Sequence, residues 1–483
     1  MARTLPSPGD QPGSGGHASV RKASFALLLL IATCLSGCDL GPDYRRPAVA
    51  PPAAWREAQG PGTWPSTAWW QGFGSSELNA LIARAQSANY DLGAAIARVR
   101  EADAEVRIAG AALLPSVAAT AGVTSQQVLA TGSGTKVNYT AYSIAPTASY
   151  EVDFWGKNSA ALQSAKASAT ASRYDQGVVD LTVVTSVANT YFQVVALQDR
   201  LQVARQNLGN GETVLRGIEA QQRAGTATEL DVAQQQTVVA GLRAAIPPLQ
   251  QQLVQNINAL AILIGTPPEQ VTVPESSLTA LAIPSVAPGL PSELLIRRPD
   301  VQEAEADLVA ANANIKVARA QFFPDVTLTA AGGFESMALS TLFTSAGGVY
   351  SLAASATQPI FEGGALEGQL QLSQARYDEL VQDYRKAVIS AFGDVENALI
   401  ATRKTDEQQV AQADTVAKAR RAFEISEAQY RGGTVTLLTV LNTENALFPA
   451  EDTLVQDRLA RLQAIVSLFQ ALGGGWENRG RLS

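Results

Sequence analysis

The sequence EAQQRAGTATELDV at residues 219–232 returns as EAQYRGGTVTLLTV at residues 427–440. Nine of the 14 positions are identical, and the two stretches lie 208 residues apart. A shared alanine-rich helix composition would match the alanines, but it does not explain the shared Arg-x-Gly-Thr motif. We interpret the pair as two copies of one structural element.

A second pair of matching stretches lies upstream. Residues 102–117 read ADAEVRIAGAALLPSV and residues 311–326 read ANANIKVARAQFFPDV, at an offset of 209. Two matches so far apart, with nearly equal offsets, indicate that a whole unit of about 208 residues is duplicated. This period is far longer than the 20–50 residues of solenoid repeats.

Each unit is expected to begin with a helix, over residues 77–112 in the first and 292–321 in the second. Pro115 and Pro324 follow these helices, and proline disfavours helix in the residue before it. Two segments of alternating polarity come next in each unit. The four expected strands are residues 116–127, 141–152, 325–336 and 349–360.

The alternation places apolar and polar side chains on opposite faces of these segments. Apolar residues sharing a face are Tyr142, Ile144, Ala148, Tyr150 and Val152 in one segment, and Val326, Leu328, Ala330 and Phe334 in another. The opposite faces carry Ser143, Thr147, Ser149, Thr327 and Thr329. Period-two runs of about ten residues are typical of membrane β-strands, although a soluble hairpin has the same pattern.

Each unit then continues as a long helical hairpin. Residues 157–223 contain no proline, and 67 residues of helix would span roughly 100 Å at ~1.5 Å per residue. Apolar residues spaced by three and four give a heptad-like seam, which a plain coiled-coil bundle would share: Leu181, Val184, Ala188, Tyr191 and Val195.

The Arg-x-Gly-Thr motifs, Arg223 to Thr226 and Arg431 to Thr434, are expected to form the tips of the hairpins. Gly225 and Gly433 suit the left-handed residue that ends a helix. The threonines that follow, Thr226 and Thr434, are expected to cap the next helix.

The N-terminus has the order of a secretory signal. Two cations, Arg21 and Lys22, precede a short apolar run, 25–35, that is too brief to span a bilayer. The run ends at Gly37-Cys38, which resembles a bacterial lipoprotein signal in which the cysteine is lipidated. A chance cysteine after a plain signal is the alternative, and the acidic Asp39 marks inner-membrane retention in some bacteria.

These features divide the chain into six parts. They are a signal peptide (1–37), a lipidated N-terminal extension (38–76), the first repeat (77–264), a proline-rich linker or equatorial segment (265–291), the second repeat (292–472) and a C-terminal tail (473–483).

The composition excludes several function classes. The one histidine, His17, and one of the two cysteines, Cys34, precede Cys38, so histidine-based catalysis and Cys/His zinc sites are not expected. The sequence has no P-loop, G-x-S-x-G or H-E-x-x-H motif. A net charge of −8 disfavours nucleic-acid binding. We therefore expect no enzyme, no cofactor and no metal.

The strands cannot close a membrane wall within one chain. After the signal no run of 18 apolar residues remains, so crossing a membrane requires a closed barrel. Four strands are too few, because the smallest such barrels have eight. Two copies would give eight strands with a filled interior, and three would give twelve with a lumen. The residues alone leave this choice open.

Several motifs resemble the TolC-type outer-membrane factor family, in its NodT-like efflux lipoprotein branch. The resemblance covers nearly all of the chain after Cys38. The resemblance rests on the paired hairpin turns and on four further motifs. These motifs are Gly41-Pro42-Asp43-Tyr44-x-x-Pro47, Trp69-Trp70 with Phe73, Arg297-Arg298-Pro299-Asp300-Val301, and Gly473-Gly474-Gly475-Trp476.

The resemblance implies a mainly α chain with a membrane β-barrel: a homotrimer with a 12-stranded barrel in the outer membrane and an α-helical barrel across the periplasm. It implies the channel of a tripartite efflux system, docked on a periplasmic adaptor and an inner-membrane pump, often of the resistance-nodulation-division class. The alternatives are the outer-membrane component of an ATP-driven type I secretion system and a lipid-anchored coiled coil without a pore.

The resemblance also implies a periplasmic gate at the hairpin tips. It carries over Asp231 as one member of a carboxylate ring and Tyr430 as a tyrosine that holds the closed state. The family's partner charges beyond the second turn are replaced here by Val435, Thr439 and Asn442. The lock is then weaker or is built from Arg223 and Arg431. For Asp231 the alternative role is a helix-start acid.

Two further sets of residues have open roles. The segment Arg297 to Asp300 is expected to be structural, because an Asp after Pro is normal at a helix start. Phe322-Phe323 and the tyrosines Tyr142 and Tyr150 are either an aromatic girdle at the membrane interface or core packing.

Overall fold

The structure is a computed structural model that describes residues 40–56, 64–129, 135–286 and 288–476. Cys38 and Asp39 lie outside the described residues. The chain forms two compact units. The first contains the sheet and comprises residues 105–165 and 310–377 together with the segment before residue 45. The second is helical and comprises residues 45–104, 166–309 and 378–483.

The duplication is visible in the lengths of the helices. Helices α3 (Tyr90–Ala111) and α8 (Pro299–Ala320) each have 22 residues and start 209 positions apart. Helices α4 (Lys157–Arg223) and α9 (Ala365–Arg431) each have 67 residues and start 208 positions apart. Helix α4 occupies the expected range, so Gly209 and Gly211 do not interrupt it.

The first helix of each unit differs from the expectation, because both are broken near the start. In the first unit Asn89 separates α2 (Ser76–Ala88) from α3, and its side chain accepts from the Leu92 amide at 2.9 Å and donates to the Leu263 carbonyl. In the second, Arg298 separates α7 (Leu294–Arg297) from α8, because Pro299 disfavours helix at the residue before it.

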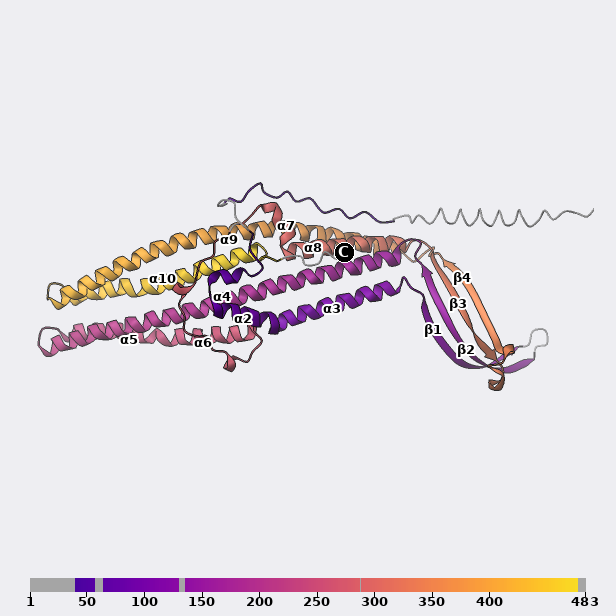
Figure 1. The fold of residues 1–483 in the computed structure, drawn as a ribbon, viewed down its shortest axis with the longest axis horizontal. Helices are drawn as coiled ribbons and strands as arrows, with labels where there is room; N and C mark the ends of the chain where they lie inside the picture. Colours follow the sequence, from indigo (N-terminus) through magenta and orange to yellow (C-terminus); the bar gives the residue numbers. More distant parts are fainter. Residues whose placement is uncertain (1–39, 57–63, 130–134, 287, 477–483) are drawn as a thin grey trace, which may run out of the picture. The chain divides into compact units, whose positions relative to one another are not determined.

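The four strands form one antiparallel sheet in the order β1-β2-β3-β4 (Figure 1). Strands β1 (Ser116–Leu129) and β2 (Lys136–Val152) come from the first repeat, and β3 (Asp325–Ser336) and β4 (Gly348–Thr357) from the second. The repeats therefore meet where β2 pairs with β3. Strands β1 and β4 are the two edges, each with an open ladder of amides and carbonyls.

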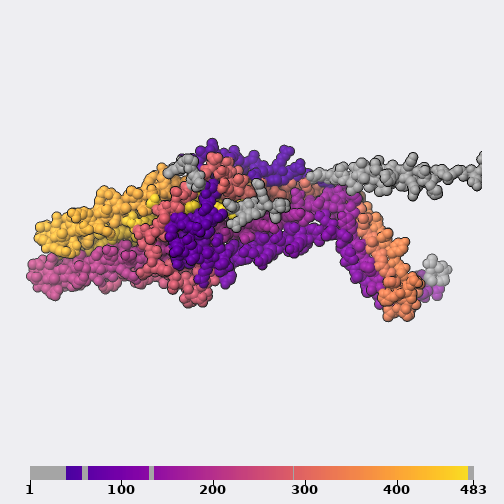
Figure 2. Space-filling view, viewed as in Figure 1, coloured from indigo at the N-terminus to yellow at the C-terminus, as the bar shows by residue number. Residues whose placement is uncertain are grey.

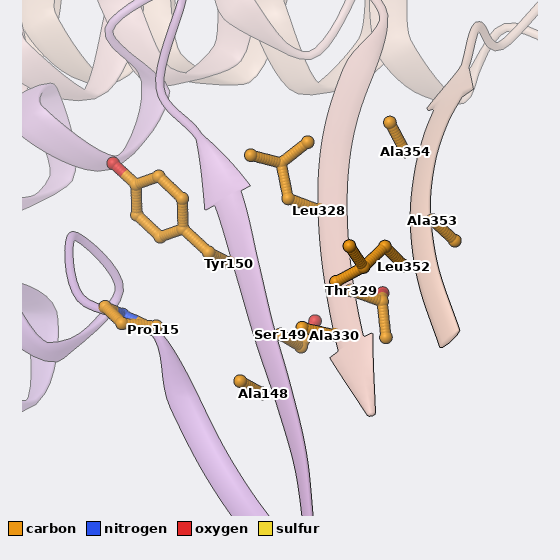
Figure 3. Close-up of a pocket in the computed structure, with 10 residues that line it drawn as sticks. All are labelled: Pro115, Ala148, Ser149, Tyr150, Leu328, Thr329, Ala330, Leu352, Ala353 and Ala354. Atoms are coloured by element: carbon orange, nitrogen blue, oxygen red, sulfur yellow. The ribbon is translucent and has the colours of Figure 1, made fainter. Parts of the chain in front are cut away.

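The strand register divides the sheet into an apolar and a polar face. Cross-strand pairs place Tyr150 against Leu328 and Ala330 against Leu352, and Figure 3 draws these side chains on β2, β3 and β4. The neighbouring rows carry Ser149 against Thr329 and Thr327 against Ser355 on the other face. Both faces agree with the alternation in the sequence, and one face suits lipid while the other suits water.

Aromatic residues lie near both ends of the sheet. Trp155 stacks on Phe323 with 4.8 Å between ring centroids, and its Nε1 donates to the Pro324 carbonyl at the end where the helices begin. Phe334 packs edge-on against Phe343 at the other end. Eight residues separate Tyr150 from Tyr142, which is about 26 Å along a strand. Outer-membrane barrels carry an apolar band about 25 Å tall between aromatic girdles.

The core of the helical unit explains several of the sequence motifs. Trp69 stacks on Phe469 at 4.6 Å, and Phe73 packs on Phe192 at 4.9 Å. A Cβ at Gly475, whose φ is +69°, would lie 2.2 Å from the Ser66 carbonyl oxygen. The Trp-Trp motif and the glycine run near the C-terminus are therefore packing elements of this core.

Arg298 has the structural role expected for its motif. The guanidinium is largely buried and pairs with Asp300 at 2.7 Å and with Asp394 at 3.0 Å. It also donates to the Ala471 carbonyl at the end of α10 (Leu437–Ala471). The motif thus joins the start of α8 to α9 and to the end of the chain's last helix.

The proline-rich segment between the repeats folds as three short 3-10 turns, η2 (Pro268–Gln270), η3 (Leu278–Ala280) and η4 (Pro291–Glu293). Asp199 of α4 accepts hydrogen bonds from the Leu278 amide and the Ser277 hydroxyl at 2.9 and 3.1 Å. These bonds hold the segment against the long helix.

Among the described residues, helix α4 contains a stretch of 18 residues with a mean hydropathy of 1.3, which length and composition alone would allow to cross a membrane. The sequence had suggested no such helix. Half of the stretch is buried within the subunit. Val187, Tyr191 and Val195 belong to the core described above, which accounts for the apolar composition.

Candidate functional site: the hairpin tips

The first tip joins α4 to α5 (Glu229–Ala244) through a left-handed turn. Gly225 has a φ of +76°, a conformation that side chains with a Cβ rarely adopt. Both the amide and the hydroxyl of Thr226 donate to the Gln221 carbonyl, at 2.9 and 3.0 Å. Thr226 therefore closes the helix that precedes it.

The second tip repeats this geometry between α9 and α10. Gly433 has a φ of +70°, and the amide and hydroxyl of Thr434 both donate to the Gln429 carbonyl at 3.0 Å. The expectation that Thr226 and Thr434 cap the following helices is therefore wrong. The residues at the N-cap positions are Thr228 and Thr436, because the turn needs two more residues to reverse the chain.

Asp231 forms a capping box with Thr228. Its carboxylate accepts from the Thr228 amide at 2.8 Å and from the Thr228 hydroxyl at 2.7 Å, and its own amide donates back to that hydroxyl at 3.2 Å. The helix-start role weighed for Asp231 is thus present in the structure. The residue remains partly exposed, so its charge is open to the surroundings of the tip.

Tyr430 links the two hairpins, which lie side by side at their tips (Figure 2). Its hydroxyl donates to Gln221 Oε1 at 2.8 Å, from the end of α9 to the end of α4. Partial burial and the nearby charge of Asp231 raise the pKa of Tyr430, which keeps the phenol protonated as a donor. The charge of Asp231 therefore acts on the Tyr430 hydroxyl within one subunit.

The two tip arginines contact their own helices. Arg223 Nε donates to the Glu219 carbonyl at 3.2 Å, and Arg431 pairs with Glu427 one turn earlier. Both side chains are exposed. Within a subunit, the structure does not bring either guanidinium onto Asp231 or Tyr430.

One residue that sequence reasoning missed lies just behind the second tip. Glu444 is fully buried, and Gln235 of the first hairpin approaches it. A signal was present in the sequence: Glu444 occupies a core position of the helical period, between Val440 and Leu447. In the described part of the chain, no group of three or more His, Cys, Asp or Glu residues could hold a metal ion.

Comparison with known proteins places this architecture in a family. A family model described as outer membrane efflux protein matches residues 81–266 and 290–474, one match for each repeat. The pyoverdine export outer membrane protein OpmQ of Pseudomonas aeruginosa is 44% identical over 466 residues, which cover 94% of this chain and 98% of OpmQ.

Two further matches agree with it. The probable efflux pump outer membrane protein TtgC of Pseudomonas putida is 34% identical over 467 residues, covering 94% of this chain and 96% of TtgC. The solved structure of the outer-membrane channel OprN is similar with a TM-score of 0.87 at 30% identity, covering 91% of this chain and 100% of OprN.

Proposed function

Because the chain belongs to the outer membrane efflux protein family and is an efflux channel subunit, we propose that its hairpin tips gate a passive pore. The pore needs no chemistry of its own, since a partner pump supplies the energy. The observation that best supports a pore is the four-stranded sheet, which has one apolar face and two open edges. Lipid offers no partner to an open edge, so neighbouring subunits must complete the wall.

The matched channels are trimers, and three copies of this sheet give twelve strands around a lumen. The small polar side chains of the other face then line that lumen. Purified protein in a planar bilayer is expected to conduct ions. A purified assembly that inserts but never conducts would favour the lipid-anchored coiled coil instead.

The gate proposal assigns two roles at the tips. Three copies of Asp231 around a narrow axis attract cations and raise the barrier to anions. The Tyr430–Gln221 hydrogen bond holds the two hairpins of a subunit together. Arg223 and Arg431 extend from the tips and are available to a neighbouring subunit, with Gly225, Thr226, Gly433 and Thr434 fixing the turns that present them.

Two variants test the gate in single-channel recordings. Tyr430→Phe removes one hydrogen bond of about 1 kcal/mol, which corresponds to roughly a fivefold shift toward the open state per subunit. Asp231→Asn is expected to lower the preference for cations, whereas Glu229→Gln, in the same first turn but outside the capping box, is the matched control. Unchanged conductance and selectivity in both variants would reject the gate.

The partner proposal rests on the family resemblance, and the cargo proposal rests on the name of one relative. We propose a periplasmic adaptor and an inner-membrane pump of the resistance-nodulation-division class, and a cargo of the pyoverdine type that the name of OpmQ states. Expression in a Pseudomonas aeruginosa strain that lacks OpmQ is expected to restore pyoverdine in the medium. Crosslinking that recovers an ATP-driven transporter instead would favour type I secretion.

We propose a lipid on Cys38, because the residues from Leu40 onward are hydrogen-bonded to helix α8. Arg319 donates to the Leu40 carbonyl at 3.1 Å and Asn312 to the Pro42 carbonyl at 2.9 Å, both from the second half of α8. Leu40 and Pro42 are thus held against α8, which is followed by strand β3 from Asp325. Mass spectrometry of the mature protein is expected to find an acylated Cys38, and an unmodified N-terminus would reject the anchor.

A further inference from the structure

Glu444 lies in an apolar environment close behind the tips. None of its surface is exposed, and its helix α10 packs there in a hydrophobic cluster with α4, α5 and α9. The cluster includes Val214, Ile218, Val232, Phe423, Val440, Leu441, Leu447 and Phe448. In the described residues no cation pairs with Glu444. A carboxylate in such a place is costly unless hydrogen bonds or a positive charge compensate it.

The polar partner of Glu444 is Gln235 of α5, which is also fully buried. Gln235 Nε2 lies 3.5 and 3.4 Å from the two carboxyl oxygens and 3.2 Å from the Gly211 carbonyl oxygen of α4. Its other side-chain atom, Oε1, is buried and receives no hydrogen bond. An ionised carboxylate has no proton to give to it, whereas a carboxylic acid has one.

We propose that Glu444 is a proton-binding residue that couples the two hairpins of each subunit. With its proton bound, and after a rotation of the Gln235 side-chain amide, Glu444 donates to Gln235 Oε1 while Gln235 Nε2 donates back, so that two hydrogen bonds join the two hairpins. When Glu444 loses the proton, Gln235 Oε1 lacks a donor and a charge is left in the apolar cluster. The joint between α5 and α10 is then weakened.

Burial favours the protonated form. It raises the pKa of Glu444 to about 7, the Gln235 hydrogen bond lowers the pKa by less than burial raises it, and the charge of Glu427 on α9 adds a smaller increase. The elements α4 and α5 present the Gly211 carbonyl and the Gln235 amide, neither of which titrates, and Glu427 itself pairs with Arg431. The joint is therefore complete below the raised pKa and is weakened as the pH rises through it, because one of its two hydrogen bonds is lost.

The position of the joint connects it to the tips, and this step rests on the proposed gate. Glu444 follows the N-cap Thr436 by eight residues, which is about 12 Å along a helix. The Tyr430–Gln221 hydrogen bond joins the hairpins at the tips, and the Glu444–Gln235 pair joins them farther along the helices, away from the tips. Loss of the second joint is expected to shift the channel toward the open state.

A second acid of α10 provides a matched control. Asp457 is buried as well and accepts from Gln408 Nε2 at 2.7 Å, but Gln408 belongs to α9 of the same hairpin. Asp457–Gln408 is thus an acid–amide pair within one hairpin, whereas Glu444–Gln235 joins two. Asp457→Asn removes a buried acid from the same helix without removing the joint between hairpins.

The experiment records single-channel open probability from pH 5 to pH 9 for the trimeric protein in planar bilayers. Wild-type protein and Asp457→Asn are expected to open more as the pH rises through about 7. Glu444→Gln keeps the shape of the side chain and supplies a permanent donor to Gln235 Oε1. The variant is therefore expected to keep the low open probability of the wild type at acidic pH over the whole pH range. Infrared difference spectra of wild type against Glu444→Gln are expected to contain a carboxylic-acid C=O band that disappears over the same range.

Two further variants separate the proton from the joint. Glu427→Gln removes the like charge and is expected to lower the pH midpoint of opening. Gln235→Met removes the joint itself and is expected to open the channel equally at every pH. Wild-type pH dependence in Glu444→Gln, or no carboxyl band assignable to this residue, overturns the proposal. If Tyr430→Phe alters conductance in the same recordings, the gate stands and only the proton joint has failed.

Discussion

The two halves of the chain share their long outgoing helices and differ in the helices that return. In the first half the return is split at Ala245 into α5 and α6 (Ile246–Leu263), while in the second α10 runs for 35 residues through Pro449. Prolines 247 and 248 stand in the first turn of α6, where no helical N–H bond is needed. Pro449 stands inside a helix, so the position of the proline decides how the helix is built.

The two tips also differ between the halves, in how their returning helices are capped. Their turns have nearly identical geometry, but the first carries a capping box with Asp231 and the second has no side-chain cap at Thr436. The duplicated backbone has been kept while the polar side chains on it have diverged. The capping carboxylate is therefore a property of the first tip, whereas Leu437 at the start of the second tip's helix packs into the apolar cluster.

The largest effect is expected where the two halves meet in the sheet. A Cβ at Gly333 of β3 would lie 2.1 Å from the Ile144 carbonyl oxygen of β2, whereas at Gly332 the nearest atoms are 4.0 Å away. Gly333→Ala is expected to cost about 3 kcal/mol or more, because backbone must move. Gly332→Ala is the control. Equal yields of folded, heat-resistant assembly from both variants would contradict the register.

The next effect concerns the two proline sites. Pro449→Ala restores a helical hydrogen bond and is expected to stabilise the protein by about 2 kcal/mol, within the cost of a proline inside a helix. Pro247→Ala is expected to change little, because the first turn tolerates proline. Thermal melting in detergent measures both. A larger increase in melting temperature for Pro247→Ala than for Pro449→Ala would contradict this difference between the two prolines.

A smaller effect is expected at the two N-caps. Thr228→Ala removes the capping box and is expected to cost about 1 kcal/mol. Thr436→Ala removes no side-chain cap and is expected to stay within about 0.5 kcal/mol of wild type. Chemical denaturation of the two variants side by side measures the difference, and equal losses would show that the tips are capped alike.

The last difference between the two halves depends on pH and lies near the start of the paired helices α3 and α8. Burial, with the charges of Asp175, Asp307 and Asp300, raises the pKa of Glu303 in α8 to about 7, and the corresponding position of α3 is Ala94. The folded state then loses stability as the pH rises from about 4.5 to 7. Glu303→Gln is expected to be more stable than wild type at pH 8, with a higher melting temperature, and equally stable at pH 4.5. An equal difference at both pH values would rule out this titration.

The features that could be predicted from the sequence are those with a local or periodic signal. The duplication, the 67-residue helix and the two faces of the strands all follow from residue spacing. Gly225 and Gly433 were identifiable because a left-handed turn strongly favours glycine. The family resemblance agrees with the comparisons over both repeats.

The features that could not be predicted depend on contacts between distant segments. Asn89 breaks a helix because its amide reaches the Leu263 carbonyl, 174 residues away. Thr226 and Thr434 close the preceding helix rather than cap the next one because their hydroxyls donate to carbonyls five residues earlier, and composition does not reveal this. The burial of Glu444 depends on the second hairpin packing against the first.

The central claim is that one chain supplies only part of a closed wall. Native mass spectrometry of the detergent-solubilised protein tests it most directly. The account predicts an assembly of three chains that conducts when it is placed in a bilayer. A stable single chain, with its four strands intact and no conductance, would contradict it.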